Sequence, residues 1–476
     1  MTLIDVLILI LAALVIRIFL PGKLRLWGML AVSILAIYWL QPALPIRNMD
    51  FWFPTATLGL ILLSWGLTAE KEQLRKPQNA WAIGISLVVV LLIGLTRYFS
   101  LEGWVTPTRP PQIYLILLVL AVFSLGAYLL ARFTQPTSTT ISIGVLVLLF
   151  LFLVLKTPVL SFYSSMGLRS LMGQDPGLAQ AVDLGWLGFS YVAFRLIHTL
   201  IDRLNGRLTD IQLGEYLVYT LFFPTFVAGP LDRLDRFRKD LNNPKPLESA
   251  TILRSGKRLA RGLFRKFILA DSLALIALSG TNVAQIQTAG WMWLLLIAFS
   301  FQIYLDFAGY TDIAIGAGHL LGFQLPENFN RPYWKPNITQ FWNNWHMTLT
   351  QWFRSYFFFP LTRYLRGEEN FPAPLVIFIT QFSTMLVIGL WHGVTRNFLI
   401  WGAWHGLGLF IHNRWHALVG PKLAEFQAGK PIYARLIQIS GIVLTFAFVS
   451  LGWVWFALPD TASALTALGK LFGAGA

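Results

Sequence analysis

The sequence predicts an all-α, polytopic membrane protein with about 11 to 13 membrane helices, including re-entrant segments. Of its 476 residues, 56% are hydrophobic and only 12% are charged, whereas soluble domains carry roughly a quarter charged residues. Long apolar stretches recur from Thr2 to Leu458. The chain has no cysteine, which excludes disulfides, zinc–thiolate sites and an acyl group held on a Cys thiolate.

The first 180 residues are predicted to be N-terminal transmembrane helices. The first apolar run contains Asp5 and Arg17 and has neither the basic start nor the cleavage site of a secretory signal, so we expect a retained helix. The basic residues favour the odd-numbered loops, which predicts an external N-terminus. Each candidate span approaches the roughly 20 residues that a bilayer requires, and they cover 3–20, 27–44, 52–68, 81–98, 112–132 and 140–160.

Further apolar segments continue through a predicted core at 181–415 and a C-terminal transmembrane helix and tail at 416–476. No repeat of fixed period is visible, which lowers the expectation of an inverted-repeat transporter. The apolar segments of the core and the C-terminal region cover 184–200, 213–230, 262–280, 288–322, 372–391, 396–415 and 435–458.

One connection is strongly basic. Residues 231–266 contain 11 of the 37 Lys and Arg residues, and the net charge of +15 suits an anionic leaflet or substrate. This connection is therefore predicted to be cytoplasmic. The preceding stretch, 213–230, has basic loops on both sides and contains Pro224, Gly229 and Pro230, so it is either re-entrant or a kinked ordinary span.

The segment 301–316 carries a polar stripe, because Gln302, Asp306 and Tyr310 recur every four residues. A carboxylate is costly at the centre of a membrane helix, so such a residue is a candidate functional group by default. The alternative is that Asp306 or Asp312 pairs with another side chain and only holds helices together.

Residues 339–359 are predicted to form one amphipathic helix, with an aromatic face that includes Trp345 and has His346 at its edge. Trp-rich helices of this kind often lie at the level of the lipid headgroups. His346 therefore belongs either to an interfacial anchor or to the wall of a buried pore.

Two further histidines lie in an apolar segment, His392 and His405. They are 13 residues apart, which on a continuous helix rotates them by about 140°, so they cannot bind one metal ion from one face. His412 and His416 have metal-like spacing, but Asn413 occupies the position where a zinc protease has its Glu. We predict no metal site.

Several ordered motifs resemble the membrane-bound O-acyltransferases, specifically the bacterial branch that acts on alginate and on teichoic acids. Asn343, Asn344, Ser355 and Thr395-Arg396 depart from the usual pattern of this branch, so the identity of the acceptor does not carry over. The motifs are FFPTFVAGPLDRLDRF at 222–237, FQIYLDFAGYTDIAIGAGHLLGFQLPENFNRPY at 301–333, the Trp345-His346 segment ending near Pro360, and LWHGVTRNFLIWGAWHG at 390–406.

The resemblance implies a central tunnel in which an acyl group passes from a cytoplasmic thioester to a hydroxyl. It implies that His392 is the catalytic base and that His346 is a second catalytic residue that shapes the tunnel. A buried, neutral histidine can accept the hydroxyl proton. Contacts with substrate are predicted for Trp345, Trp391, Asn397, Asp306, Tyr310 and Arg233.

The resemblance also implies the protein's partners. The donor is acetyl-CoA or another thioester, and no cofactor is expected. The acceptor is a cell-surface polysaccharide or exopolysaccharide, reached directly or through an extracytoplasmic acyltransferase. The setting is the inner (plasma) membrane and its lipids, and no nucleic-acid module is visible.

Three alternatives stay open. D-alanyl transfer to teichoic-type polymers would use the same architecture. A transporter or polysaccharide exporter would also have many spans and a buried Asp306. A glycosyltransferase that uses lipid-linked sugars usually has acidic residues in its first outer loop, where only Asp50 is available.

Overall fold

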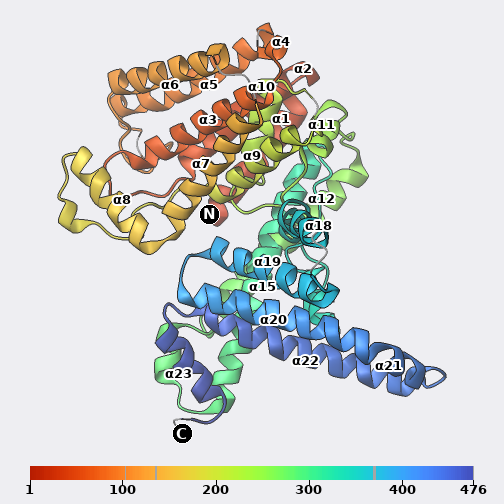
Figure 1. Cartoon of the computed structure of the whole chain (residues 1–476). Coiled ribbons are helices and arrows are strands. Elements are labelled where there is room, and N and C mark those ends of the chain that lie inside the picture. Colours follow the sequence, from red (N-terminus) through yellow and green to blue (C-terminus); the bar gives the residue numbers. More distant parts are fainter. Residues whose placement is uncertain (75, 102, 134–136, 209, 368–370, 475–476) are drawn as a thin grey trace. The chain divides into compact units, whose positions relative to one another are not determined.

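The computed structural model covers the chain, and its described residues are 1–476 except 75, 102, 134–136, 209, 368–370 and 475–476. Over this part of the chain the regular secondary structure is helical and contains no strand (Figure 1). The residues form two compact units, which are 1–259 with 312–326 (unit 1) and 260–311 with 327–476 (unit 2). The all-α prediction is confirmed. The regional boundaries predicted at 180 and 415 do not coincide with this division and stay a prediction.

Unit 1 contains the helices of the first half of the chain. Short 3₁₀ turns interrupt the connections at Thr96–Tyr98 and Pro176–Leu178. The helices are α1 (Leu3–Phe19), α2 (Gly22–Trp39), α3 (Met49–Thr68), α4 (Lys71–Leu74), α5 (Pro77–Leu95), α6 (Ile113–Phe133), α7 (Ser138–Lys156), α8 (Pro158–Leu171), α9 (Phe189–Leu204), α10 (Leu213–Leu221), α11 (Leu234–Asn242) and most of α12 (Ser249–Leu263).

The segment 213–230 is broken, as its prolines and glycine predicted. Helix α10 has nine residues and is about 14 Å long, too short to cross a bilayer. Where it ends, the buried guanidinium of Arg195 donates hydrogen bonds to the carbonyls of Thr220 (2.7 Å) and Thr225 (3.2 Å) and to the Thr225 hydroxyl (2.7 Å). Arg195 thereby satisfies backbone groups that the interrupted helix leaves unpaired.

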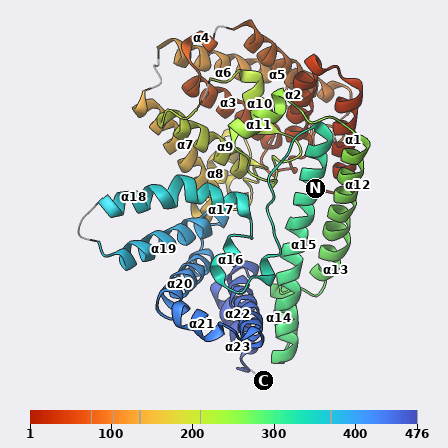
Figure 2. The ribbon, with the colours of Figure 1, turned by 90° about the vertical axis from the view of Figure 1, so that its right-hand side faces the viewer.

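Unit 2 contains the second half of the chain. Two π-helical segments, Phe264–Ala270 and Arg354–Phe358, and a 3₁₀ turn at Pro332–Trp334 connect its helices, and α20 and α22 lie side by side (Figure 2). The helices are α13 (Asp271–Ala274), α14 (Gly280–Gln285), most of α15 (Ala289–Leu321), α16 (Ile338–Trp342), α17 (Met347–Phe353), α18 (Phe359–Gly367), α19 (Ala373–His392), α20 (Arg396–Leu418), α21 (Gly420–Gln427), α22 (Pro431–Ala457) and α23 (Thr461–Leu471).

Within the described residues, six helices are long and apolar enough to span a bilayer, and they support a polytopic membrane protein. They are Met49–Thr68, Pro77–Tyr98, Ser138–Lys156, Ala289–Leu321, Ala373–His392 and Pro431–Ala457. The predicted apolar segment 262–280 is instead divided among the end of α12, a π-helix, α13 and an irregular stretch.

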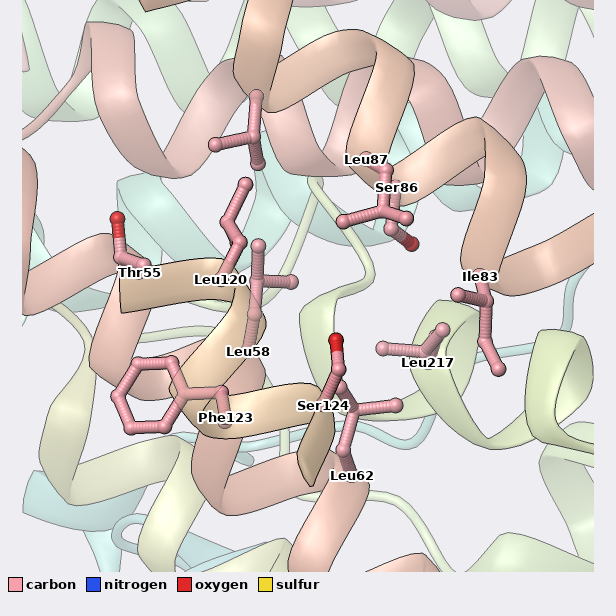
Figure 3. A pocket seen from close by; sticks show the side chains of 12 residues that line it. Thr55, Leu58, Leu62, Ile83, Ser86, Leu87, Leu120, Phe123, Ser124 and Leu217 are labelled. Carbon is pink, nitrogen blue, oxygen red and sulfur yellow. The ribbon is translucent and has the colours of Figure 1, made fainter. Parts of the chain in front are cut away.

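One hollow in unit 1 is apolar and offers little chemistry. Helices α3, α5, α6 and α10 enclose it, with a volume of about 50 Å³ (Figure 3). Its polar groups are the hydroxyls of Thr55, Ser86 and Ser124. The hydroxyl of Thr55 donates a hydrogen bond to Phe51 O (2.9 Å), and that of Ser86 donates one to Ala82 O (2.7 Å). The hollow is too small and too apolar to be a substrate site.

Candidate functional site

His346 lies at a break between two helices. The prediction of one amphipathic helix over 339–359 is wrong: α16 ends at Trp342 and α17 begins at Met347. His346 itself has a φ of 42°, a left-handed conformation that is uncommon outside glycine and often marks functional positions. The predicted aromatic face is therefore not continuous.

The connection that follows α15 holds this break in place. The amide of Asn330 donates to the carbonyl of Asn344 (3.1 Å), and the amide of Met347 donates to the carbonyl of Asn328 (2.9 Å). The side-chain oxygen of Asn328 accepts a hydrogen bond from the Thr348 hydroxyl (2.7 Å) and lies 3.3 Å from Nδ1 of His346. Tertiary hydrogen bonds therefore replace the helical ladder that periodicity alone predicts.

Burial sets the charge of His346. Its side chain is 4% exposed, and its ring meets Phe307 of α15 edge-on at 4.6 Å between ring centres. Burial lowers the pKa of His346 to about 3. The imidazole is therefore neutral at physiological pH and can exchange protons or hydrogen bonds without a net charge.

Trp345 is the centre of an aromatic cluster. Its ring lies 5.2 to 6.1 Å from those of five neighbours. One of them, Tyr333, donates its hydroxyl to the carbonyl of Ser300 (2.8 Å) and accepts a hydrogen bond from Nε1 of Trp453 (3.1 Å). The cluster gives the site rigid walls. The five neighbours are Tyr304, Phe329, Tyr333, Phe341 and Trp453.

His392 is placed by a tightly packed helix pair. A Cβ at Gly402 would approach the Met385 carbonyl to 2.6 Å, and one at Gly389 would collide with the carbonyl of Phe398. These glycines let α19 and α20 approach closely. His392 is the last residue of α19, is half-buried, and has its ring 4.8 Å from that of Phe456.

Trp391 connects the two predicted catalytic histidines. Its ring centre lies 4.4 Å from that of His392 and 6.3 Å from that of His346. Four of the predicted site residues, Trp345, His346, Trp391 and His392, thus meet in unit 2. That they form one catalytic site, and the chemical role of each, stay predictions.

His405 belongs to the same region, although the sequence assigned it no specific role. It is fully buried, and its ring centre lies 4.9 Å from that of Trp401, which in turn lies 5.4 Å from the ring centre of His392. Neither ring nitrogen has a hydrogen-bond partner within the described part of the chain. A buried polar group without a hydrogen-bond partner is rare in native proteins, and it points to a functional position. The feature of the sequence that could have singled out His405 is the tripeptide Trp-His-Gly, which occurs at both 391–393 and 404–406.

The acidic residues of α15 form ion pairs. Asp306 binds the ammonium of Lys266, and a carboxylate oxygen of Asp312 forms an ion pair with Arg258, at 3.1 Å from Nε. This is the structural alternative that the sequence left open. Tyr310 is buried on the same helix. Contacts of Asp306 and Tyr310 with a substrate stay predictions.

The remaining two predicted site residues are Asn397, whose side chain is already hydrogen-bonded, and Arg233, which belongs to unit 1. The amide nitrogen of Asn397 donates to the carbonyl of Leu458 (2.9 Å), and its oxygen accepts from the Thr461 hydroxyl (2.9 Å). These bonds fix the turn between α22 and α23. Arg233 is exposed at the start of α11, in unit 1. Their predicted contacts with substrate are untested.

Comparison with known proteins adds independent evidence. Residues 111–452 match the model of the MBOAT, membrane-bound O-acyltransferase family. The chain is 33% identical over 324 residues to a "Probable alginate O-acetylase AlgI" of Pseudomonas syringae pv. tomato, a match that covers 66% of this chain and 57% of that protein.

Two other relatives have different printed functions. A teichoic acid D-alanyltransferase of Streptococcus thermophilus is 34% identical over 243 residues, which is 49% of this chain and 58% of that protein. A peptidoglycan O-acetyltransferase of Helicobacter pylori is 33% identical over 277 residues, which is 57% of this chain and 49% of that protein. The chain thus matches about half the length of these relatives.

Proposed function

Because this chain belongs to the membrane-bound O-acyltransferase family, we propose that it transfers an acetyl group from a cytoplasmic thioester, acetyl-CoA, to a hydroxyl of a cell-surface polysaccharide or exopolysaccharide. The observation that carries the proposal is the contact of Trp391 with both His392 and His346. This contact brings together the family motif that contains His346 and the family motif that contains His392.

The relatives favour acetyl over D-alanyl transfer. The alginate O-acetylase of Pseudomonas syringae matches 66% of this chain, and the D-alanyltransferase of Streptococcus thermophilus matches 49%. A peptidoglycan O-acetyltransferase also belongs to the group. D-alanyl transfer to a teichoic-type polymer is the second candidate, because that relative shares the same core at 34% identity.

In the proposed reaction, a ring nitrogen of His392 removes the proton of the acceptor hydroxyl. The resulting oxyanion attacks the thioester carbonyl and forms the new C–O bond. The C–S bond then breaks, and the thiolate leaves with the electron pair and takes up the proton from His392. Neutral His346 donates a hydrogen bond that orients donor or acceptor, and no cofactor takes part.

The proposal places the protein in the inner membrane, with the basic connection 231–266 on the cytoplasmic side near the donor. Phosphate-rich CoA suits such a face. The acetyl group reaches its polysaccharide directly or through an extracytoplasmic acyltransferase that accepts it from this protein.

The test uses purified full-length protein in liposomes with radiolabelled acetyl-CoA. Acetyl transfer to an added polysaccharide, or slow hydrolysis of acetyl-CoA without one, is expected. A transporter would show neither reaction. D-alanyl thioester used in place of acetyl-CoA separates the two candidate acyl groups, since the preferred donor gives the higher kcat/KM.

A further inference from the structure

Unit 1 contains an arginine-lined pocket distant in sequence from the predicted catalytic histidines. Its volume is about 680 Å³, within the roughly 300 to 1,000 Å³ of small-molecule sites. Three arginines line it, Arg47, Arg97 and Arg109, and none forms an ion pair with a carboxylate in the described part of the chain. Among the lining residues that the structure describes, none is acidic.

The guanidinium groups are held by the backbone. Arg97 donates to the carbonyl of Pro110 at 2.6 Å, Arg109 donates to the carbonyl of Arg97 at 3.3 Å, and Arg47 donates to the carbonyl of Met172 at 3.4 Å. Each bond uses one of the five donors that a guanidinium has. The remaining donors are available to a ligand with anionic oxygens.

A buried carboxylate lies behind one wall of the pocket. Asp50 accepts hydrogen bonds from the amide (3.1 Å) and the hydroxyl (2.5 Å) of Thr108. Both bonds end on the same oxygen, Oδ2, and in the described part of the chain no ion pair joins Asp50 to the pocket arginines, so Asp50 offsets only part of their positive charge. Among the described residues at the pocket, three guanidiniums against one carboxylate leave it electropositive.

The pocket lies at one end of the helices of unit 1. Arg47 precedes α3, Arg97 follows α5, and Arg109 precedes α6. The α3–α5 connection lies at the opposite end, because these helices run in opposite directions through α4. Figure 1 shows α4 and α8 at opposite ends of unit 1, and Gln174, just after α8, lines the pocket.

The basic connection belongs to the α4 end. Glu70, beside α4, pairs with Arg203 at the end of α9 (3.5 Å). Arg238 of α11 donates to the carbonyl of Asp210, just beyond α9 (2.8 Å). The positive-inside rule assigns this end to the cytoplasm, and the pocket therefore faces the other side of the membrane. Arginines are depleted in outer loops, so three around one pocket require a specific reason.

The other lining groups indicate the kind of anion. Asn48 and Gln112 supply amide groups, and Tyr114 supplies an exposed aromatic ring. The amide of Gln174 is already used, because its oxygen accepts from the amide of Arg47 (2.8 Å) and its nitrogen donates to the carbonyl of Pro45 (3.1 Å). Amides bind sugar hydroxyls, and an aromatic ring packs against a sugar face. By contrast, a hollow of about 340 Å³ with Arg17 and Arg25 also contains Glu215, so its charge is partly neutralised.

We propose that this pocket binds an acidic sugar unit of the acceptor polymer, through a carboxylate or phosphate oxyanion, on the side of the membrane opposite the donor. The inference rests on the proposed function and specifies the substrate class. Guanidinium groups bind both kinds of oxyanion in bidentate geometry. The pocket would hold the polymer by this acidic unit before acyl transfer.

The experiment measures binding without any acyl donor, by isothermal titration calorimetry of the full chain in detergent. The probes are a short oligogalacturonate, a glycerol phosphate oligomer, a neutral maltooligosaccharide and an oligoglutamate peptide. We expect at least one acidic polymer to bind, more weakly as salt rises. Its preference for carboxylate or phosphodiester identifies the oxyanion. The neutral sugar should not bind.

The variant R47Q/R97Q/R109Q should weaken binding of that polymer about tenfold or more, since even one charged hydrogen bond lost has about this effect. The variant R47K/R97K/R109K retains the charge and should bind with intermediate affinity, because lysine lacks the planar fork. It serves as the test if the glutamine variant does not fold. The matched control is K422Q/K430Q/R435Q, which removes three exposed charges elsewhere.

Unchanged affinity in both arginine variants would overturn the proposal, as would equal binding of the neutral sugar. Binding of oligoglutamate as tightly as the acidic sugar would instead make the pocket a site for an acidic protein segment, and would equally overturn it. Because no donor is present, these results are independent of transfer. A protein that binds the polymer through the arginines but never transfers acetyl would refute the proposed function alone.

Discussion

Arg195 of unit 1 and His405 of unit 2 are both buried polar residues within apolar surroundings, yet their environments differ. Arg195 is surrounded by acceptors, the carbonyls of Thr220 and Thr225 and the Thr225 hydroxyl. His405 is surrounded by aromatic rings, and both of its ring nitrogens lack partners in the described structure. A polar group with its acceptors in place supports the fold, whereas one without them is a candidate for function.

The largest effect is expected at His392, next to the aromatic environment of His405. His392→Ala and His392→Gln should lower acetyl transfer about 10²- to 10⁴-fold, because they remove a positioned general base. The measurement is single-turnover transfer in liposomes, with donor binding determined in parallel. His416→Ala, which removes an exposed histidine, is the control. Near-normal transfer by either His392 variant would end the assignment.

The next largest effect concerns stability in unit 1. Arg195→Met should lower the free energy of unfolding by about 2 kcal/mol or more, because the carbonyls of Thr220 and Thr225 lose their donors within the protein interior. Thermal unfolding in detergent measures the change. Arg207→Met, an exposed arginine of the same unit, should behave like the parent protein. Equal stability of both variants would show that Arg195 is not needed at the break.

Whereas Arg195→Met should lower the stability of the protein, His405→Phe should keep its stability but lower its activity. It replaces an unpartnered polar ring by an apolar one of similar shape, which is neutral or stabilising. Transfer should nevertheless fall about tenfold, corresponding to about 1.4 kcal/mol in the activation free energy, and thus less than for His392→Ala. Paired measurements of melting temperature and kcat/KM test this. A variant that is stable and fully active would make His405 a packing residue.

A smaller effect follows from the charge of His346. Its folded-state pKa of about 3 lies below the ordinary value of about 6.5, so the unfolded state binds the proton more readily. Stability is therefore lost as pH falls below about 6.5, by about 1.4 kcal/mol at pH 5.5 from this group. His346→Asn should flatten the pH dependence of the melting temperature over this range. Parallel curves for the two proteins would contradict the neutral, buried state of His346.

The smallest effect concerns donor binding by the basic connection. Two arginines of this connection already have acidic partners, because Arg236 binds Asp232 (2.8 Å) and Arg238 binds Glu215 (3.1 Å). The double variant Arg233→Gln with Lys239→Gln therefore tests donor binding more directly than a variant of Arg236 or Arg238, since both side chains are exposed.

This variant should raise the apparent KM for acetyl-CoA about threefold, and more at low salt, where charge attraction is least screened. Steady-state kinetics at two ionic strengths measure the change, and K422Q/K430Q removes the same charge elsewhere. A KM that does not respond would remove this surface from the donor site.

The amino-acid sequence by itself determined the all-α membrane fold, the presence of a break within 213–230 and the family. Length, apolar content and proline positions act locally, and the motifs around His392 and His346 are specific enough to be recognised without coordinates. The bilayer also restricts the choice of fold, since a spanning backbone must satisfy its own hydrogen bonds.

Only the tertiary structure decided how polar residues are used. Periodicity predicted one helix over 339–359, but the amides and carbonyls of 328–330 compete for its backbone and leave His346 at a break. The sequence predicts that Asp306 contacts a substrate, and only the fold shows that it is paired with Lys266, a residue 40 positions away in the chain. The three arginines of the unit 1 pocket come from two connections that only folding brings together. Pairing of this kind depends on contacts between residues far apart in the chain, which no local pattern encodes.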